Sequence, residues 1–188
     1  MLCAEKRAFR TRAKALAAAL PPAENAAASA ALCGHLAQLP ALAAAKTVCC
    51  FVGLPDEPDT RPFLEAVLAQ GKTLCLPRVQ GRGVLALCAV PSLTGLAPGA
   101  FGILEPRPEA RILPPESVDL CVVPCLAGAP DGHRLGRGGG YYDRLLPRLR
   151  PDAVTVLACR KALLFPRVPA GEQDAVCNLV VTEEGALP

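Results

Sequence analysis

The chain has 188 residues, a length that fits one domain and is too short for a two-domain enzyme of ordinary size. Hydrophobic residues make up 52% of the sequence and charged residues 20%, so the composition favours a single folded core and excludes disorder. Lys and Arg outnumber Asp and Glu by 20 to 17, an excess too small to indicate nucleic-acid binding. We therefore expect one domain over residues 1–188, with no nucleic acid among its partners.

The first part of the chain predicts two helices and then a strand. Apolar residues recur at helical spacing over residues 5–20, which predicts an amphipathic helix with a basic stripe on another face. An Ala-rich second helix is expected over residues 23–39 and should end before Pro40. Residues 47–54 are β-branched and apolar without clean alternation, which predicts a strand covered on both faces.

The rest of the chain alternates strands with helices. Strands are predicted over residues 73–76, 84–90, 120–123, 154–159 and 179–182, helices over residues 61–70 and 141–149, and a loop rich in Pro and Gly over residues 96–108. Strands that alternate with helices indicate crossover connections and a mainly parallel sheet. The predicted fold class is α/β, as a single three-layer α/β/α sandwich whose ligand lies at the carboxyl ends of the strands.

The ten cysteines raise the question of a metal or disulfide framework. No two of them have the spacing Cys-x-x-Cys, and the chain has two histidines, so a zinc cluster is excluded. Several lie within apolar runs, where a thiol behaves as a small hydrophobic group. No run approaches the ~18 apolar residues of a membrane span. We expect free buried thiols, a cytoplasmic protein and no membrane partner, although the basic Ala-rich start also fits a mitochondrial presequence.

The most informative segment is Arg-Leu-Gly-Arg-Gly-Gly-Gly-Tyr-Tyr-Asp at residues 134–143, between a predicted strand and a predicted helix. Its four glycines allow close backbone approach to an anion, and the start of a helix favours negative charge. Arg134 and Arg137 add charges that suit bidentate phosphate contacts. The segment predicts a phosphate site; the alternative is a flexible glycine hairpin with solvated arginines.

This segment differs from the common nucleotide motifs, because it has neither the Gly-Lys-Ser/Thr ending of a P-loop nor a G-x-G-x-x-G pattern. Asp143 would repel a phosphate bound nearby unless a divalent cation lay between them, so Mg²⁺ is implied. The alternative for Asp143 is a simple acid at a helix start. Tyr141 and Tyr142, the two tyrosines of the chain, would stack on a ring or bond the anion, or else belong to the core.

Four collinear segments resemble the 5-formyltetrahydrofolate cyclo-ligase family, also called methenyltetrahydrofolate synthetases. They are Lys6 to Arg10, the stretch Asp56-Glu57-Pro58-Asp59-Thr60, the loop Phe101-Gly102-Ile103-Leu104-Glu105-Pro106 and the signature over residues 134–146 with its lead-in from Val123. The resemblance implies an α/β/α sandwich enzyme. It also implies the conversion of 5-formyltetrahydrofolate into 5,10-methenyltetrahydrofolate, with ATP as co-substrate, Mg²⁺ as cofactor and release of ADP and phosphate.

The resemblance also implies roles for individual residues. Arg137 and Tyr142 would be catalytic, Arg137 by stabilising charge on the transferred phosphoryl group. The implied folate-binding residues are Val52, Glu57, Arg137, Gly138, Gly139, Gly140 and Tyr141, with Glu57 accepting two hydrogen bonds from the pterin. Asp143 and Asp174 match magnesium-associated residues. The implied ATP-binding residues are Lys6, Arg7, Ala8, Phe9, Arg10, Arg134, Leu135, Gly136, Arg137, Gly138, Gly139, Gly140, Tyr141 and Tyr142.

The chain departs from the family pattern in three places. Asn178 stands where a second Asp is common, residues 158–162 replace the usual Ala-Phe-x-x-Gln stretch, and Phe101 is the nearest candidate for a pocket tryptophan. The alternatives to a cyclo-ligase are a divergent paralogue that acts on another amide or pterin, and a folate- or nucleotide-binding regulator without catalysis. For Glu57 the alternative is a surface acid in a loop. We expect a monomer.

Overall fold

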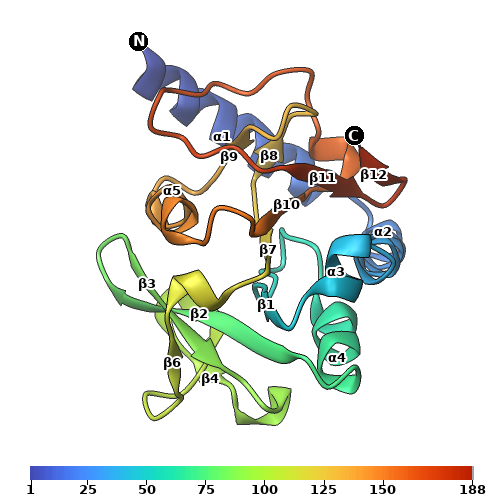
Figure 1. Ribbon diagram of the computed structural model, residues 1–188. Helices are drawn as coiled ribbons and strands as arrows, with labels where there is room; N and C mark the ends of the chain where they lie inside the picture. The colour runs from blue at the N-terminus through green and yellow to red at the C-terminus, as the bar shows by residue number, and fades with distance from the viewer. Residues whose placement is uncertain (188) are drawn as a thin grey trace.

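A computed structural model describes residues 1–187, which form a three-layer α/β/α sandwich around an eight-stranded sheet (Figure 1). The strand order is β12-β11-β10-β7-β1-β2-β3-β6. The sheet strands are β1 (Thr47–Cys49), β2 (Thr73–Gly81), β3 (Val84–Ala89), β6 (Ile112–Leu113), β7 (Leu120–Val123), β10 (Val154–Ala158), β11 (Leu179–Thr182) and β12 (Gly185–Leu187). The pairings from β11 through β2 are parallel, and the outer pairings are antiparallel. The predicted fold class is thus confirmed.

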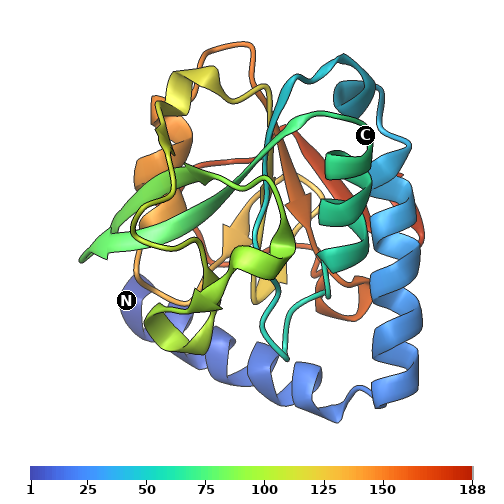
Figure 2. The same ribbon diagram turned by 90° about the horizontal axis from the view of Figure 1, so that it is seen from below.

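The helices cover both faces of this sheet. They are α1 (Leu2–Ala19), α2 (Pro22–Ala37), α3 (Pro40–Ala44), α4 (Arg61–Ala69) and α5 (Tyr141–Leu145). Figures 1 and 2 show α2, α3 and α4 on one side of the sheet and α5 on the other, with α1 beside the small β-ribbon of β8 (Ala127–Gly128) and β9 (Arg134–Leu135). None of the described helices is long and apolar enough to cross a bilayer.

Short elements complete the described chain. A second ribbon pairs β4 (Ala97–Pro98) with β5 (Leu104–Glu105), inside the stretch predicted as a loop. The 3₁₀ turns are η1 (Leu93–Gly95), η2 (Ala100–Gly102), η3 (Pro115–Ser117), η4 (Leu146–Arg148) and η5 (Lys161–Leu163).

Two apolar layers hold the sandwich together. On one face, Leu32 and Leu36 of α2 and Phe63 of α4 pack against strand residues such as Val48 and Val122, all fully buried. On the other face, Leu145 and Leu146 join another buried cluster. Full burial of one such side chain is worth about 1.5–3 kcal/mol, so these layers supply most of the packing energy.

Eight of the ten cysteines belong to these layers, in agreement with the prediction of free buried thiols. All ten are free, and all but Cys3 are buried. The registers place Cys49 beside both Cys75 and Cys121 on neighbouring strands. Burial raises the pKa of Cys177 to about 12, so this thiol stays protonated. Among the residues that the structure describes, no cluster of three His, Cys, Asp or Glu side chains could hold a metal ion.

Prolines account for two helix boundaries that the sequence analysis misplaced. The helix expected over 23–39 ends at Ala37, and Pro40 begins α3 instead of only ending α2, because the first helical turn needs no proline N–H. The helix expected over 141–149 is α-helical only to Leu145 and continues as η4. Pro147 in that turn has no N–H to continue the α-helical ladder.

Two strands also have other lengths than predicted. The strand expected over 47–54 ends at Cys49, after which the chain leaves the sheet toward a cavity. The strand expected over 73–76 continues through Pro77 to Gly81 as one arm of a hairpin with β3. The N–H of Val79 donates to the Glu105 side chain rather than to β3. Pro77 lies two residues earlier in the same strand, so its nitrogen also faces away from β3. Its missing N–H therefore removes no bond of the ladder.

Candidate active site

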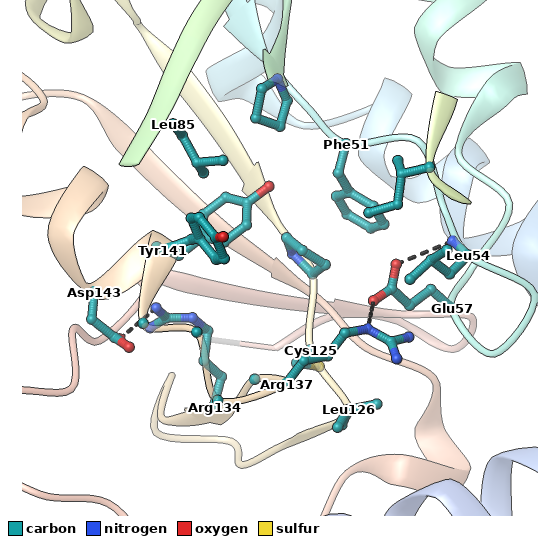
Figure 3. Close-up of a pocket in the computed structure, with 18 of the residues that line it drawn as sticks. Phe51, Leu54, Glu57, Leu85, Cys125, Leu126, Arg134, Arg137, Tyr141 and Asp143 are labelled. Atoms are coloured by element: carbon teal, nitrogen blue, oxygen red, sulfur yellow. Dashed lines mark hydrogen bonds and ion pairs between the residues drawn. The ribbon is translucent and has the colours of Figure 1, made fainter. Parts of the chain in front are cut away.

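A cavity of about 600 Å³ opens at the carboxyl ends of β1 and β7, where a mainly parallel sheet places its ligands (Figure 3). It joins segments that are far apart in the sequence. Its lining includes Lys6, Arg10, Val52, Glu57, every residue from Arg134 to Asp143, and Asp174. The structure therefore brings together most of the residues that the sequence analysis singled out.

The glycine segment runs from β9 into α5 in a fixed conformation. Gly138 has φ +102° and Gly140 has φ +64°, values that favour glycine. Arg10 Nε donates to the carbonyl of Gly136 at 2.8 Å, and Arg144 binds the carbonyls of both Gly83 and Gly139. These contacts contradict the alternative of a flexible hairpin. Because α5 has five residues, its dipole contributes less to anion binding than a nine-residue helix would.

One end of the cavity, which we call the cationic end, pairs each acidic side chain with a basic one. Arg134 Nη2 lies 2.6 Å from Asp143 Oδ1, and Lys6 binds Asp174 Oδ2. Backbone amides add to both pairs, since Ala175 N donates to Asp143 at 3.2 Å and Gly171 N donates to Asp174 at 2.6 Å. Arg134 is 7% exposed, so it is not the solvated arginine of the alternative interpretation.

The pKa of Asp174 is shifted by this environment. Burial alone would raise the pKa, but the Lys6 ammonium and the Gly171 amide outweigh burial and hold the pKa below its ordinary value. The guanidinium of Arg134 acts in the same direction. Asp174 is therefore an ionised carboxylate at neutral pH.

The carboxylates of Asp143 and Asp174 are the residues of the cationic end that could hold a divalent cation. Asp143 Oδ2 and Asp174 Oδ1 accept no hydrogen bond from the residues that the structure describes, so one oxygen of each is available. Mg²⁺ is commonly held by one or two carboxylates together with phosphate and water oxygens.

The other end of the cavity, which we call the apolar end, surrounds one buried carboxylate. Glu57 is 7% exposed, and its Oε2 accepts the N–H of Leu54 at 3.1 Å. The walls of the apolar end are formed by apolar side chains, those of Phe51, Val52, Leu54, Ile103 and Leu104. The alternative of Glu57 as a surface acid is therefore wrong.

Arg137 connects the apolar end to the glycine segment. Its Nε donates to Glu57 Oε1 at 3.1 Å (Figure 3). Its Nη2 binds Asp56. Burial raises the pKa of Glu57, against the opposing effects of the Leu54 amide and of Arg137. For Arg137, burial would lower the pKa, but Asp56 and Glu57 raise it above its ordinary value. The guanidinium is therefore permanently charged.

The tyrosines combine the two interpretations left open by the sequence. Tyr142 lines the cavity and also packs against the buried cluster beneath α5, and burial raises its pKa well above the ordinary value. Figure 3 shows Tyr141 between the Arg134–Asp143 pair and Leu85 of β3. The Tyr142 hydroxyl is therefore neutral at neutral pH and can donate a hydrogen bond.

Some predicted residues lie elsewhere. Arg7 and Ala8 are exposed on α1 and are not among the cavity-lining residues, and Phe9 packs edge-on against Phe165 with ring centroids 4.8 Å apart. Asn178 accepts hydrogen bonds from the amide and hydroxyl of Thr155, at the base of β10. The interpretation of Phe101 concerns a side chain outside the described part of the structure.

Two buried charges were missed. Glu105 is 7% exposed, lines the cavity and accepts the N–H of Val79 at 3.3 Å. Arg160 is 2% exposed and donates to the carbonyls of Asp56 and Glu57. The Gly-Ile-x-Glu-Pro resemblance was a signal for Glu105. No sequence pattern pointed to Arg160, because its partners are main-chain oxygens about 100 residues away.

Comparisons with known proteins agree with this geometry. The model of the 5-formyltetrahydrofolate cyclo-ligase family matches residues 3–183. The chain belongs to the 5-formyltetrahydrofolate cyclo-ligase family. A 5-formyltetrahydrofolate cyclo-ligase of Mycolicibacterium smegmatis is 32% identical over 76% of each chain, and one of Escherichia coli is 30% identical over 76% of this chain and 81% of the relative.

A solved structure extends this likeness to the fold. The NMR structure of the 5,10-methenyltetrahydrofolate synthetase of Aquifex aeolicus superposes with a TM-score of 0.85 and 34% identity, covering 96% of this chain and 91% of that protein. The family predicted from the four collinear segments is thus confirmed, and it is a family of enzymes.

Proposed function

We propose that this protein uses ATP and Mg²⁺ to convert 5-formyltetrahydrofolate into 5,10-methenyltetrahydrofolate, with release of ADP and phosphate. The observation that carries the proposal is the single cavity in which Arg137 joins the cationic end to the apolar end through its bond to Glu57. Transfer of a phosphoryl group from ATP to a second substrate requires that both substrates lie in one cavity with the reacting atoms adjacent.

The apolar end suits the reduced pterin. Its walls would contact the ring faces, and each oxygen of a carboxylate can accept more than one hydrogen bond. Glu57 already accepts one bond from Leu54 and one from Arg137, which leaves lone pairs for a ring N–H and an amino group of the pterin. Burial strengthens such bonds, so Glu57 would select a ligand with adjacent donors.

The cationic end suits the phosphates of ATP. Lys6, Arg10 and Arg134 would neutralise phosphate charge, and the amides of the glycine segment would donate to phosphate oxygens. Asp143 and Asp174 would hold Mg²⁺, which supplies neutralisation of the charge that develops on the phosphates. Lys6 and Arg134 then exchange a carboxylate partner for a phosphate, and the carboxylates exchange a basic side chain for the metal.

The chemistry follows from the poor leaving ability of the formyl oxygen. That oxygen attacks the γ-phosphorus, the bond to the β–γ bridging oxygen breaks, and ADP leaves. N10 then attacks the activated carbon, phosphate departs with the former formyl oxygen, and the N10 proton goes to the phosphate. Arg137 would stabilise the charge on the transferred phosphoryl group, and Tyr142 would donate a hydrogen bond beside it.

The test is the appearance of the near-ultraviolet absorbance band of methenyltetrahydrofolate. We expect the band to grow when purified protein, 5-formyltetrahydrofolate, ATP and Mg²⁺ are all present, and not when any one of them is omitted. A folded protein that gives no band under these conditions would refute the proposal. A band that forms without ATP would refute the phosphoryl-transfer mechanism.

We also propose a cytoplasmic setting and a monomeric state. Nine buried free thiols suit a reducing compartment.

A further inference from the structure

Arg160 is the bulkiest fully buried side chain of the described chain, yet it lies outside the cavity lining. It follows β10 and precedes η5, in the stretch where the chain departs from the family pattern. Burial lowers its pKa, so the fold opposes its charge. An arginine buried in this way is costly unless its donors are used.

Two nitrogens of the guanidinium donate to one short segment, while the buried Nε has no hydrogen-bond partner among the described residues. Arg160 Nη1 donates to the carbonyl of Asp56 at 3.1 Å, and Arg160 Nη2 donates to the carbonyl of Glu57. Residues 50–60 contain no helix or strand, and no backbone amide of the described chain donates to either carbonyl. Arg160 therefore satisfies two main-chain acceptors that regular structure does not satisfy.

The same two residues form the carboxylate pair of the cavity. Asp56 and Glu57 both bind Arg137 through their side chains. Arg160 thus holds their main-chain oxygens while Arg137 holds their carboxylates. The turn is closed by the Glu57 amide, which donates to the Leu54 carbonyl at 2.8 Å. Any rotation of the Asp56–Glu57 peptide would move the Glu57 carboxylate and, with it, Arg137.

We propose that Arg160 is a positioning residue for folate recognition: it fixes the two peptide groups that flank Glu57, Asp56–Glu57 and Glu57–Pro58, so that the Glu57 carboxylate faces the pterin. This inference rests on the proposed function of the cavity. Arg160 touches no substrate and acts through Glu57. A buried arginine that merely supports the fold would instead affect stability without favouring one substrate over the other.

The test compares Arg160→Met, which keeps the aliphatic stem, with Arg160→Lys, which keeps charge but loses the two-pronged geometry. We expect Arg160→Met to raise the KM for 5-formyltetrahydrofolate by roughly tenfold, with a KM for ATP within about twofold of the wild type. Arg160→Lys should give a smaller effect in the same direction. Leu36→Ala, in the core beneath α2, is the control for lost stability and should leave both KM values unchanged below its melting temperature.

A double-mutant cycle separates positioning from folding and remains available if Arg160→Met does not fold. Once Glu57→Gln has removed the carboxylate, adding Arg160→Lys should raise the folate KM little further. Fully additive effects, or equal effects on both substrates, would overturn the inference. So would an unchanged folate KM in folded Arg160→Lys. If the wild-type protein makes no methenyltetrahydrofolate, the proposed function fails instead.

Discussion

The two ends of the cavity solve different electrostatic problems. At the cationic end, each carboxylate is paired with a basic side chain and a backbone amide, as in the Lys6–Asp174 pair. At the apolar end, Glu57 lies among apolar side chains with its pKa raised by burial. Paired charges can be exchanged for those of a nucleotide and its metal at little cost, whereas a buried carboxylate selects a ligand by hydrogen-bond donors. Arg137 is the residue at which the ends meet.

The largest expected effect comes from breaking this junction. Arg137→Ala should lower kcat by on the order of 10²-fold or more, because the proposed mechanism assigns to Arg137 the stabilisation of charge on the transferred phosphoryl group. Steady-state kinetics by methenyltetrahydrofolate absorbance measure this effect. Arg148→Ala, an exposed arginine of η4 outside the cavity lining, is the matched control. An Arg137→Ala enzyme with wild-type kcat would remove the junction from the mechanism.

The next effect should be confined to the apolar end. Glu57→Gln replaces an acceptor for two pterin donors by an amide, so the KM for 5-formyltetrahydrofolate should rise about tenfold while the KM for ATP changes little. Glu65→Gln, an exposed acid on α4, controls for the substitution itself. A selective loss of ATP affinity in Glu57→Gln would reverse the assignment of the two ends.

A smaller effect is expected at the cationic end. Lys6→Ala should weaken apparent ATP affinity several-fold, because Lys6 is one of several cations there and its side chain is 18% exposed. Lys14→Ala on the exposed face of the same helix should have no effect. Equal losses in the two variants would mean that the whole helix, rather than the site, supplies the attraction.

The smallest effect concerns pH. The proposed function has Glu57 bind the pterin as a carboxylate, so folate kcat/KM should fall as pH drops through the raised pKa of Glu57, at a higher pH than for an ordinary glutamate. Because the folded state raises this pKa, the stabilising contribution of Glu57 is instead present at low pH and lost as pH rises. The other ionisable groups that act on Glu57 or are acted on by it are Arg137, Asp56, Arg160, Tyr142 and Cys125.

The pH profile of kcat/KM with and without Glu57→Gln measures the effect. Glutamine cannot titrate, so the acid limb that Glu57 causes should disappear in the variant. An identical acid limb in both proteins would assign it to another group.

Local patterns were enough to predict the α/β class, the central strands and the glycine segment. Apolar runs predicted strands such as the one over residues 120–123, and the glycines and arginines of residues 134–143 indicated the phosphate site. The β2–β3 hairpin was missed because Pro77, which has no N–H, is tolerated only where its nitrogen faces away from the partner strand, which a sequence does not show. The burial and contacts of Arg160 could not be predicted either, since they depend on carbonyl groups that lie near it only in the folded chain.

The most direct test of the account is a crystal structure with a non-hydrolysable ATP analogue, Mg²⁺ and 5-formyltetrahydrofolate bound together. We expect the phosphates along Gly136–Gly140, the pterin on Glu57 and the formyl oxygen facing the γ-phosphate beside Arg137. Ligands bound elsewhere, with this cavity holding only solvent, would contradict it.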